Sequence, residues 1–189
     1  MEIIKAIYQR RATRHFSDAE VTKGVAHDLV RAAAQAPSAF NQQPWAFGIF
    51  HGRERLRAYS DRAKDHLLAT AEPLFGLDPR IDQYCDDKYN IYHDADTLIV
   101  IFAKPGRHSP VEDCFLAAQN LMLAAFGVGL GSCPVGFARS WFNLLEVKAE
   151  LGIPDHYIAV LPIVVGYPAF PPPAVEKNEP EIACWQWDE

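Results

Sequence analysis

The sequence predicts an α+β fold in which helices cover a central sheet. Two β-branched runs, TLIVIFA at 97–103 and YIAVLPIVVG at 157–166, lack polar alternation. Such runs are typical of strands buried on both faces. Between them lies the alanine-rich, apolar stretch that begins at Glu112, which predicts a helix. We see no internal repeat, and 189 residues suffice for one sizeable core, so we expect a single domain over 1–189.

Hydrophobic periodicity and capping residues predict the other elements. Ile3, Ile4 and Ile7 fall on one face of an N-terminal helix. Thr22 is suited to cap the next helix, which Pro37 ends. In chain order we predict helix 2–8, helix 22–36, strand 46–50, helix 53–70, strand 97–103, helix 112–127, helix 142–151 and strand 157–166. Residues 72–92 are poorly periodic, and we predict an excursion over a pocket.

The helix at 112–127 is predicted to be the core helix. Acidic Glu112 and Asp113 favour a helix N-terminus, and apolar residues then cover nearly every face. A helix that is apolar all round is expected to be buried. Gln119 and Asn120 interrupt the run well short of the roughly 20 apolar residues that a membrane span needs. The segment is therefore not predicted to cross a membrane.

The glycine-rich stretch at 127–136 follows this helix. It is predicted either to cap the helix and turn the chain, or to bring backbone close to another group. The spacing Gly127-x-Gly129-x-Gly131 lacks the third interval of a dinucleotide-binding fingerprint and follows a helix where that fingerprint follows a strand. We therefore do not predict a Rossmann-type site here.

Charge and cysteine usage exclude several classes of protein. The formal net charge of -6 argues against a general binder of nucleic acid or anionic membranes, which needs a basic surface. The N-terminal residues lack a signal peptide, and we expect a cytoplasmic protein. The four cysteines lack the spacing of a zinc site, so we predict mostly buried, reduced thiols and no metal.

Two short segments carry candidate binding residues. Arg10, Arg11, Thr13 and Arg14 predict an anion site, because guanidinium groups bind phosphate oxygens in pairs. The alternative is a solvated basic cluster at the end of a helix. The polar loop from Pro37 to Trp45 is able to clamp a heteroaromatic ring, or is an ordinary proline-bounded turn.

The C-terminal residues 167–189 form a proline-rich arm. Three consecutive prolines exclude a helix or a sheet interior and favour extended geometry. Ile182, Trp185 and Trp187 follow, and large apolar side chains at a free terminus need a surface to pack on. We predict that the arm embraces a partner subunit; the alternative is a disordered end.

Four segments together resemble the FMN-dependent nitroreductase family, and the resemblance covers essentially the whole chain. In chain order they are Arg10-Arg11-Ala12-Thr13-Arg14-x-Phe16, Pro37-Ser38-Ala39-x-Asn41-x-Gln43-Pro44-Trp45, Gly129-Leu130-Gly131-Ser132-Cys133 and Pro134-Val135-Gly136-Phe137. The resemblance implies an α+β homodimer of nitroreductase-like fold, with two flavin sites in the subunit interface. It also implies that the C-terminal arm extends onto the partner.

The resemblance also assigns residues to the cofactor. Arg10 and Arg14, within the segment that includes Arg11 and Ala12, would hold the FMN phosphate. From the other subunit, the ring would be approached by Pro37, Ser38, Ala39 and Asn41, with Gln43 as a further contact. Pro134, Val135 and Gly136 would cover one ring face, with Val135 and Gly136 near flavin N5, and Lys177 is the candidate C-terminal phosphate ligand. Ala12 and Val135 depart from the family, which often has a serine at the first position and can have an acidic residue at the second.

The implied reaction is a two-step transfer. NAD(P)H would reduce FMN and leave, and a nitroaromatic, quinone or activated alkene would then take two electrons, a ping-pong mechanism. No side chain is assigned as a catalytic acid. Phe75, Tyr84 and Tyr89 would shape the acceptor pocket. The sequence does not decide between NADH and NADPH.

Two alternatives remain at this point. A non-catalytic flavin-binding or storage protein would use the same contacts. An enzyme with Cys133 as nucleophile would need an activating histidine nearby in space. None of the histidines sits in a recognisable motif; they are His15, His27, His51, His66, His93, His108 and His156.

Overall fold

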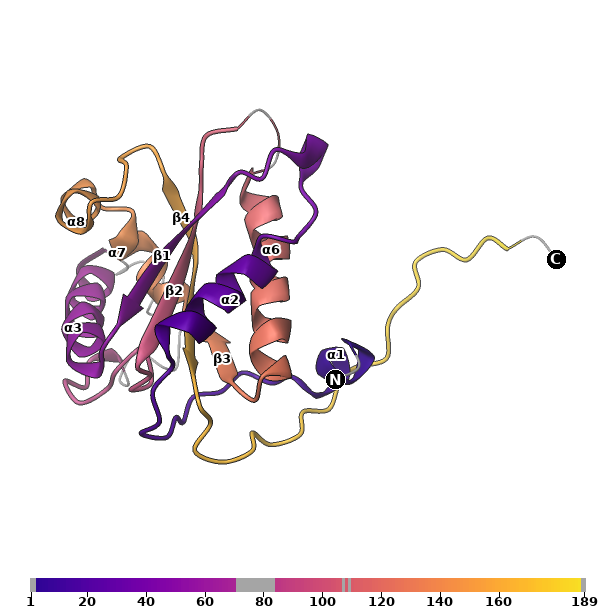
Figure 1. The fold of residues 1–189 in the computed structure, drawn as a ribbon, viewed down its shortest axis with the longest axis horizontal. Helices are drawn as coiled ribbons and strands as arrows, with labels where there is room; N and C mark the ends of the chain where they lie inside the picture. The colour runs from indigo at the N-terminus through magenta and orange to yellow at the C-terminus, as the bar shows by residue number, and fades with distance from the viewer. Residues whose placement is uncertain (1–2, 71–83, 107, 109, 188–189) are drawn as a thin grey trace.

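A four-stranded antiparallel sheet forms the centre of the molecule (Figure 1). The structure is a computed structural model that describes residues 3–70, 84–106, 108 and 110–187. The strand order is β1-β2-β4-β3. The strands are β1 (Trp45–His51), β2 (Thr97–Ala103), β3 (Gly131–Pro134) and β4 (Ile158–Gly166). The three predicted strands are confirmed, and β3 was not predicted.

The central strands explain why the sequence shows no polar alternation there. Every residue of β2 is buried. Ile99 and Ile101 pack into one apolar cluster, while Leu98 and Val100 pack into a second cluster on the opposite face. Successive side chains of a strand point to opposite faces. Both faces of the sheet are therefore covered, as predicted.

Helices form a layer on each side of the sheet (Figure 1). On one side lie α2 (Lys23–Ala33) and α6 (Pro110–Gly127), which pack on each other. On the other side lie α3 (Arg53–Thr70), α7 (Arg139–Phe142) and α8 (Leu145–Leu151). The predicted helix 53–70 is confirmed at both ends, and Thr22 caps α2 by accepting the N–H of Val25 at 3.3 Å. The α+β class is confirmed.

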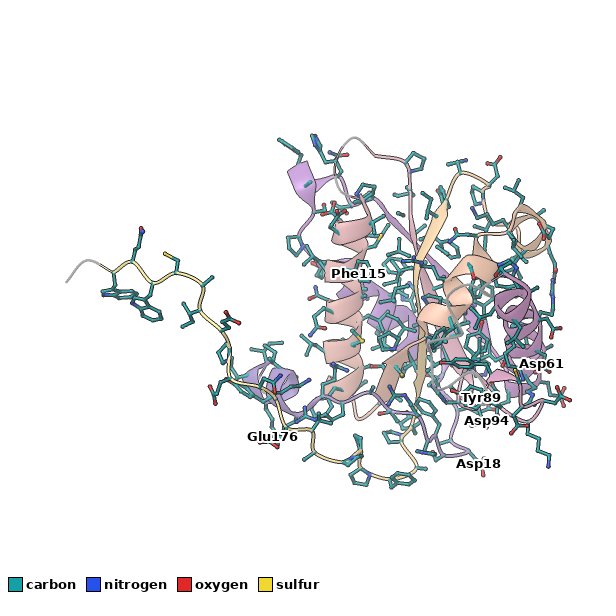
Figure 2. The ribbon with its side chains drawn as sticks, turned by 180° about the vertical axis from the view of Figure 1, so that it is seen from behind. Asp18, Asp61, Tyr89, Asp94, Phe115 and Glu176 are labelled. Carbon is teal, nitrogen blue, oxygen red and sulfur yellow. The ribbon has the colours of Figure 1, made fainter. Side chains whose placement is uncertain are left out.

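The helix α6 is only half buried within the chain, which corrects the prediction of an all-round buried helix. Ala117, Leu121 and Ala125 are fully buried toward the sheet and α2. Phe115 and Leu116 face outward with 44% and 47% of their surface exposed; Phe115 is labelled in Figure 2. The sheet and α2 cover only one side of α6, so its other apolar side stays open in a single chain.

The start of the glycine-rich stretch caps α6 and turns the chain, as predicted: Gly129 has a φ of 81°, and the N–H of Leu130 donates to the Ala125 carbonyl at 2.9 Å. Residues 131–134 then form the edge strand β3, which was not predicted. Gly131 pairs with Gly166 of β4, and both glycines have another segment lying against them. A Cβ on Gly131 would lie 2.4 Å from Oγ1 of Thr13, and one on Gly166 would lie 2.7 Å from the ring of Phe16. These glycines therefore let the N-terminal segment lie close against the sheet.

The predicted helix 142–151 is broken into α7 and α8, preceded by the short η2 (Gly136–Ala138). Asn143 stands between the two helices. Its amide donates to the carbonyl groups of Arg139 at 2.9 Å and Ala159 at 3.1 Å, and it accepts the N–H of Ala159 at 2.9 Å. These bonds tie the break to the start of β4, a long-range contact that periodicity does not reveal.

The N-terminal helix α1 (Ile3–Gln9) and the C-terminal arm are both largely uncovered. Ile3, Ile4 and Ile7 of α1 are exposed, and Trp185 and Trp187 of the arm expose 69% and 77% of their surface. The arm runs past α1 and leaves the body of the molecule (Figure 1). Among the described helices, none combines the length and hydropathy needed to cross a membrane.

Candidate functional site

The N-terminal arginine segment leaves its helix and crosses the edge of the sheet. Arg11 ends α1, donating from Nη1 to the carbonyl oxygens of Tyr8 at 2.7 Å and Arg10 at 2.8 Å. Ala12 then forms a bridge with Ser132, and the N–H of Thr13 donates to the Ser132 carbonyl at 3.0 Å. The helix α1 therefore ends before Ala12, and the segment continues along the sheet edge. The segment is fixed by backbone bonds, which leaves Arg10 and Arg14 available to a ligand.

The first of two adjoining cavities, which we call the arginine cavity, has a volume of about 460 Å³. Arg10, Arg11, Arg14 and Lys177 supply its cationic groups. Lys177 belongs to the C-terminal arm, so residues far apart in sequence meet here as predicted. Buried Nε of Arg11 has no hydrogen-bond partner among the described residues. The described residues that line the cavity include no carboxylate, which suits an anion.

The second cavity, which we call the aromatic cavity, has a volume of about 760 Å³. Arg14, His15 and Phe170 line both cavities, so the two adjoin. Aromatic side chains from several segments line the larger one. They are Phe16, Tyr84, Tyr89, Phe137 and Phe170. The two together form a site with a cationic end and an aromatic end.

Pro134, Val135 and Gly136, which are predicted to cover one face of the ring, form one wall of the aromatic cavity. Two of these three residues have no backbone N–H to offer a ligand. Pro134 has no N–H, and Val135 donates its own to the carbonyl of Pro162 at 2.8 Å. The Gly136 N–H has no acceptor within the described residues, and a Cβ added there would meet nothing within 4 Å. The Gly136 N–H is therefore the backbone donor of this wall that can bind a ligand.

The facing wall comes from the segment before β2. Tyr84 and Tyr89 line the cavity, as predicted, whereas Phe75 lies outside the described residues. Lys64 and Arg57 of α3 hold this segment: Lys64 Nζ donates to the carbonyl of Asp86 at 3.1 Å. Arg57 donates to the carbonyl groups of Lys88, at 2.8 Å, and of Asp87. The cationic groups of α3 thus position this wall of the cavity.

A turn next to Tyr89 brings a histidine into the cavity that the sequence did not single out. Buried Asn90 accepts the N–H of Tyr92 at 2.9 Å through its side chain, and that of His93 at 2.8 Å through its carbonyl. Its amide donates to Asp94 at 2.9 Å. His93 and Asp94 both take left-handed φ values, 56° and 55°. Figure 2 shows labelled Tyr89 and Asp94 close together at this end of the molecule.

The charge state of His93 follows from its surroundings. Burial, together with the positive charges of Arg14 and His15, lowers the pKa of His93 from 6.5 to about 4, while Asp94 acts in the opposite direction. The imidazole is therefore neutral at pH 7, and it both donates and accepts hydrogen bonds.

Cys133 lines the aromatic cavity but lacks the surroundings of a nucleophile. It is buried, its thiol donates to the Pro134 carbonyl at 3.5 Å, and burial raises the pKa of the thiol. The neighbouring Arg14 and Arg10 lower the pKa of the thiol, but burial has the larger effect. A reactive cysteine needs a lowered pKa, which Cys133 does not have. All four cysteines are free, and of these Cys85 and Cys184 are exposed, which corrects the prediction that most are buried.

The predicted ring-binding loop, 37–43, lies away from both cavities in the same chain. The carboxylate of Asp113 anchors it by accepting the N–H of Ala39 at 3.2 Å. Asp113 is in the first turn of α6, whereas β3 follows the other end of this 18-residue helix. At 1.5 Å per residue the two ends are about 27 Å apart. One chain therefore does not bring this loop to its own cavities (Figure 1).

The loop itself is held in one conformation. Phe40, Asn41 and Gln43 have left-handed φ values of 51°, 54° and 48°. The Gln43 N–H donates to Ser38 Oγ at 3.0 Å, and its side chain donates to Asn41 Oδ1 at 3.1 Å. Non-glycine residues at such angles are strained and persist where surrounding bonds hold them. Phe40, which was not among the predicted contact residues, is exposed and packs against the ring of His108.

The site thus has the form expected for a ligand with an anionic group at one end and a flat aromatic system at the other. A family model described as the nitroreductase family matches residues 7–167. The chain therefore belongs to the nitroreductase family, which confirms the resemblance and makes it an oxidoreductase of the nitroreductase type.

Individual proteins agree with this membership. A protein of Archaeoglobus fulgidus with the provisional name NADH dehydrogenase/NAD(P)H nitroreductase is 29% identical, over 88% of this chain and 86% of its own. The 4-nitrobenzoate reductase of a Nocardioides species is 26% identical, over 84% of this chain and 77% of its own. The crystal structure of a nitroreductase with bound FMN from Bacteroides fragilis superposes with a TM-score of 0.83 at 22% identity, covering all of both chains. The nitroreductase-like fold is confirmed.

Proposed function

We propose that this protein is an NAD(P)H-dependent flavin oxidoreductase, with FMN held across the arginine and aromatic cavities. The observation that carries the proposal is Arg14, which lines both cavities between a cationic end and an aromatic end. FMN carries a phosphate and a flat ring on one molecule, so it needs both ends at once. The names of the archaeal relative and of the Bacteroides structure, which mention NAD(P)H and FMN, support the choice of cofactor.

The residues present fit this cofactor. Arg10, Arg14 and Lys177 would hold the phosphate, and the buried Nε atom of Arg11, which has no partner among the described residues, marks unused hydrogen-bonding capacity beside them. The open space beside Gly136 and its available N–H fit a ring that lies against this wall. Val135 uses its N–H on the carbonyl of Pro162 and its carbonyl on the N–H of Ala138, and neither Ala12 nor Val135 has a polar side chain to offer a ligand.

Bound FMN would supply the hydride chemistry, taking two electrons from NADH or NADPH and giving them to an acceptor in a separate ping-pong step. The protein's own contribution is to orient the ring and exclude water. Arg14 borders the aromatic cavity and would place a positive charge beside the ring, where it would stabilise negative charge that develops there. We infer that aromatic acceptors stack between Tyr84, Tyr89 and the Pro134 wall; the relative named 4-nitrobenzoate reductase supports a nitroaromatic.

The loop 37–43 would complete the site from a second copy of the chain. Within one chain, it sits at the far end of α6 from the cavities. The apolar side of α6 with Phe115 and Leu116, and the exposed isoleucines of α1, are available for such an interface. We therefore propose a homodimer in which Pro37, Ser38, Ala39, Asn41 and Gln43 reach the partner's ring, and in which the C-terminal arm packs on the partner. A cytoplasmic location remains our expectation.

The test of this function is steady-state NADH and NADPH oxidation by the FMN-loaded protein with a quinone or 4-nitrobenzoate as acceptor. Turnover that depends on both FMN and acceptor supports the enzyme. Tight FMN binding without turnover would favour the storage protein. A Cys133→Ala variant separates the remaining alternative, because the flavin mechanism predicts nearly unchanged turnover and a cysteine nucleophile predicts its loss.

A further inference from the structure

We propose that His93 is a further cofactor-contact residue, whose imidazole hydrogen-bonds a polar edge of FMN beside Arg14. This inference rests on the proposed function. It adds a residue from the segment before β2, for which the sequence predicts acceptor contacts by Tyr84 and Tyr89 but no contact with FMN. It also gives a role to the turn at His93 and Asp94, which brings the imidazole of His93 to the aromatic cavity.

The position of His93 is the first support. It lines the aromatic cavity together with Pro134 and Gly136, so it faces the same space as the predicted ring-binding wall. Its imidazole is close enough to Arg14 and His15 for their charges to act on it. Arg14 and His15 stand where the two cavities adjoin. A ring that extends from this junction would present an edge to His93.

The backbone of the turn is the second support. Two successive non-glycine residues, His93 and Asp94, are held in the left-handed region. Such strain persists only where other bonds hold it, and it concentrates at functional sites. Asn90 supplies those bonds, using its carbonyl for His93 and its side chain for Tyr92 and Asp94. Asn90 is thus a positioning residue for His93.

The chemistry of the imidazole is the third support. Three titratable groups act on the imidazole of His93: Arg14 and His15 from the N-terminal segment, and Asp94 from its own turn. Lys88 and Cys133 also line the cavity. Asp94 already accepts from Asn90, so it offers only part of its capacity to His93. In these surroundings the imidazole stays neutral and both donates and accepts. The pyrimidine edge of a flavin alternates carbonyl acceptors with an N–H donor, so a neutral imidazole can either donate to a carbonyl or accept from the N–H there.

The experiment measures FMN binding to the apoprotein by fluorescence quenching, with no acceptor or nicotinamide present. His93→Ala is expected to raise the Kd for FMN about three- to tenfold, the effect of one lost hydrogen bond. His93→Gln, whose amide also donates and accepts, is expected to stay within about twofold of wild type. His27→Ala, a substitution of an exposed histidine on α2, is the matched control and leaves the Kd unchanged.

A second readout separates contact from mere support of the fold. In protein labelled with ¹⁵N-histidine, the His93 signals are identified by their absence in His93→Gln, and FMN is expected to shift them. Unshifted signals, or an unchanged Kd in His93→Ala, would overturn the inference while leaving FMN binding by the wild type intact. A wild type that takes up no FMN would overturn the proposed function itself, and this inference with it.

Discussion

Arg14 matters more than its neighbours because it borders both cavities, whereas Arg11 is occupied with the end of α1. We expect Arg14→Ala to weaken FMN binding about ten- to a hundredfold, since hydrogen bonds to charged groups contribute about 1.5–3 kcal/mol. Titration of apoprotein with FMN measures this. Arg31→Ala, at an exposed position on α2, is the control. Equal affinities for the two variants would remove Arg14 from the site.

The pKa of His93 predicts a pH effect on stability. Its value of about 4 in the fold lies below 6.5, so between these pH values the unfolded chain binds the proton and the folded chain does not. Stability from this residue is therefore fully present above pH 6.5 and is lost as pH falls toward 4. Urea unfolding at pH 7.5 and pH 5 should show a smaller loss for His93→Gln than for wild type. An equal loss in both proteins would contradict the neutral, buried imidazole.

Among the elements, the contact between the N-terminal segment and β3 depends on one missing side chain. A Cβ at position 131 would lie 2.6 Å from Cβ of Thr13, closer than packing allows. We expect Gly131→Ala to cost about 1–3 kcal/mol of unfolding free energy and to weaken FMN binding, because the arginine segment must shift. Thermal or urea unfolding gives the first quantity.

Two variants sharpen this test. Gly24→Ala, in α2, meets only Oγ1 of Thr22 at 3.9 Å and should be neutral or slightly stabilising. Adding Thr13→Gly to Gly131→Ala should recover part of the lost unfolding free energy, since it removes the side-chain atoms of Thr13 that the new Cβ would meet. If Gly131→Ala matched Gly24→Ala in stability, the close approach of the segment to β3 would be wrong.

At this scale, the sequence predicted long elements well and short ones poorly. The predicted boundaries of α3 and β2 match the observed ones. A regular helical period marks α3, and a continuous apolar run marks β2. The four residues of β3 include Gly131 and Pro134, which signal a turn, and only pairing with β4 makes them a strand. The break at Asn143 likewise depends on Ala159, far along the chain.

The site shows the same division. The arginine segment and the Pro134 wall were predicted because their motifs are local, and the structure brings them to adjoining cavities. His93 was not predicted, since its left-handed turn uses Asn90, His93 and Asp94 where a glycine would have signalled it. The hydrogen bond from the Val135 N–H to the Pro162 carbonyl also could not be predicted from the sequence, because it joins the Pro134 wall to a distant strand, β4.

For the whole molecule, the uncovered apolar surfaces predict an obligate association of two chains. In the arm beyond Lys177, Trp185 and Trp187 stack on each other and expose 69% and 77% of their surface in the described part of the chain. We expect truncation after Asn178, which keeps Lys177, to weaken the dimer by at least tenfold, because it removes the apolar area of the arm. Sedimentation over a range of concentrations measures this. Trp185→Ala with Trp187→Ala should act in the same direction, and an unchanged dimer constant in both would contradict the embrace by the arm.

Reduction of FMN held in the two adjoining cavities is the central step of the proposed function. Its most direct test is the visible spectrum of the purified protein, loaded with FMN, before and after anaerobic addition of NADH and of NADPH. We predict flavin absorption that is lost on reduction and restored by a quinone, in wild type but much less in Arg14→Ala at limiting FMN. A protein that takes up no FMN, or whose bound FMN neither nicotinamide reduces, would contradict it.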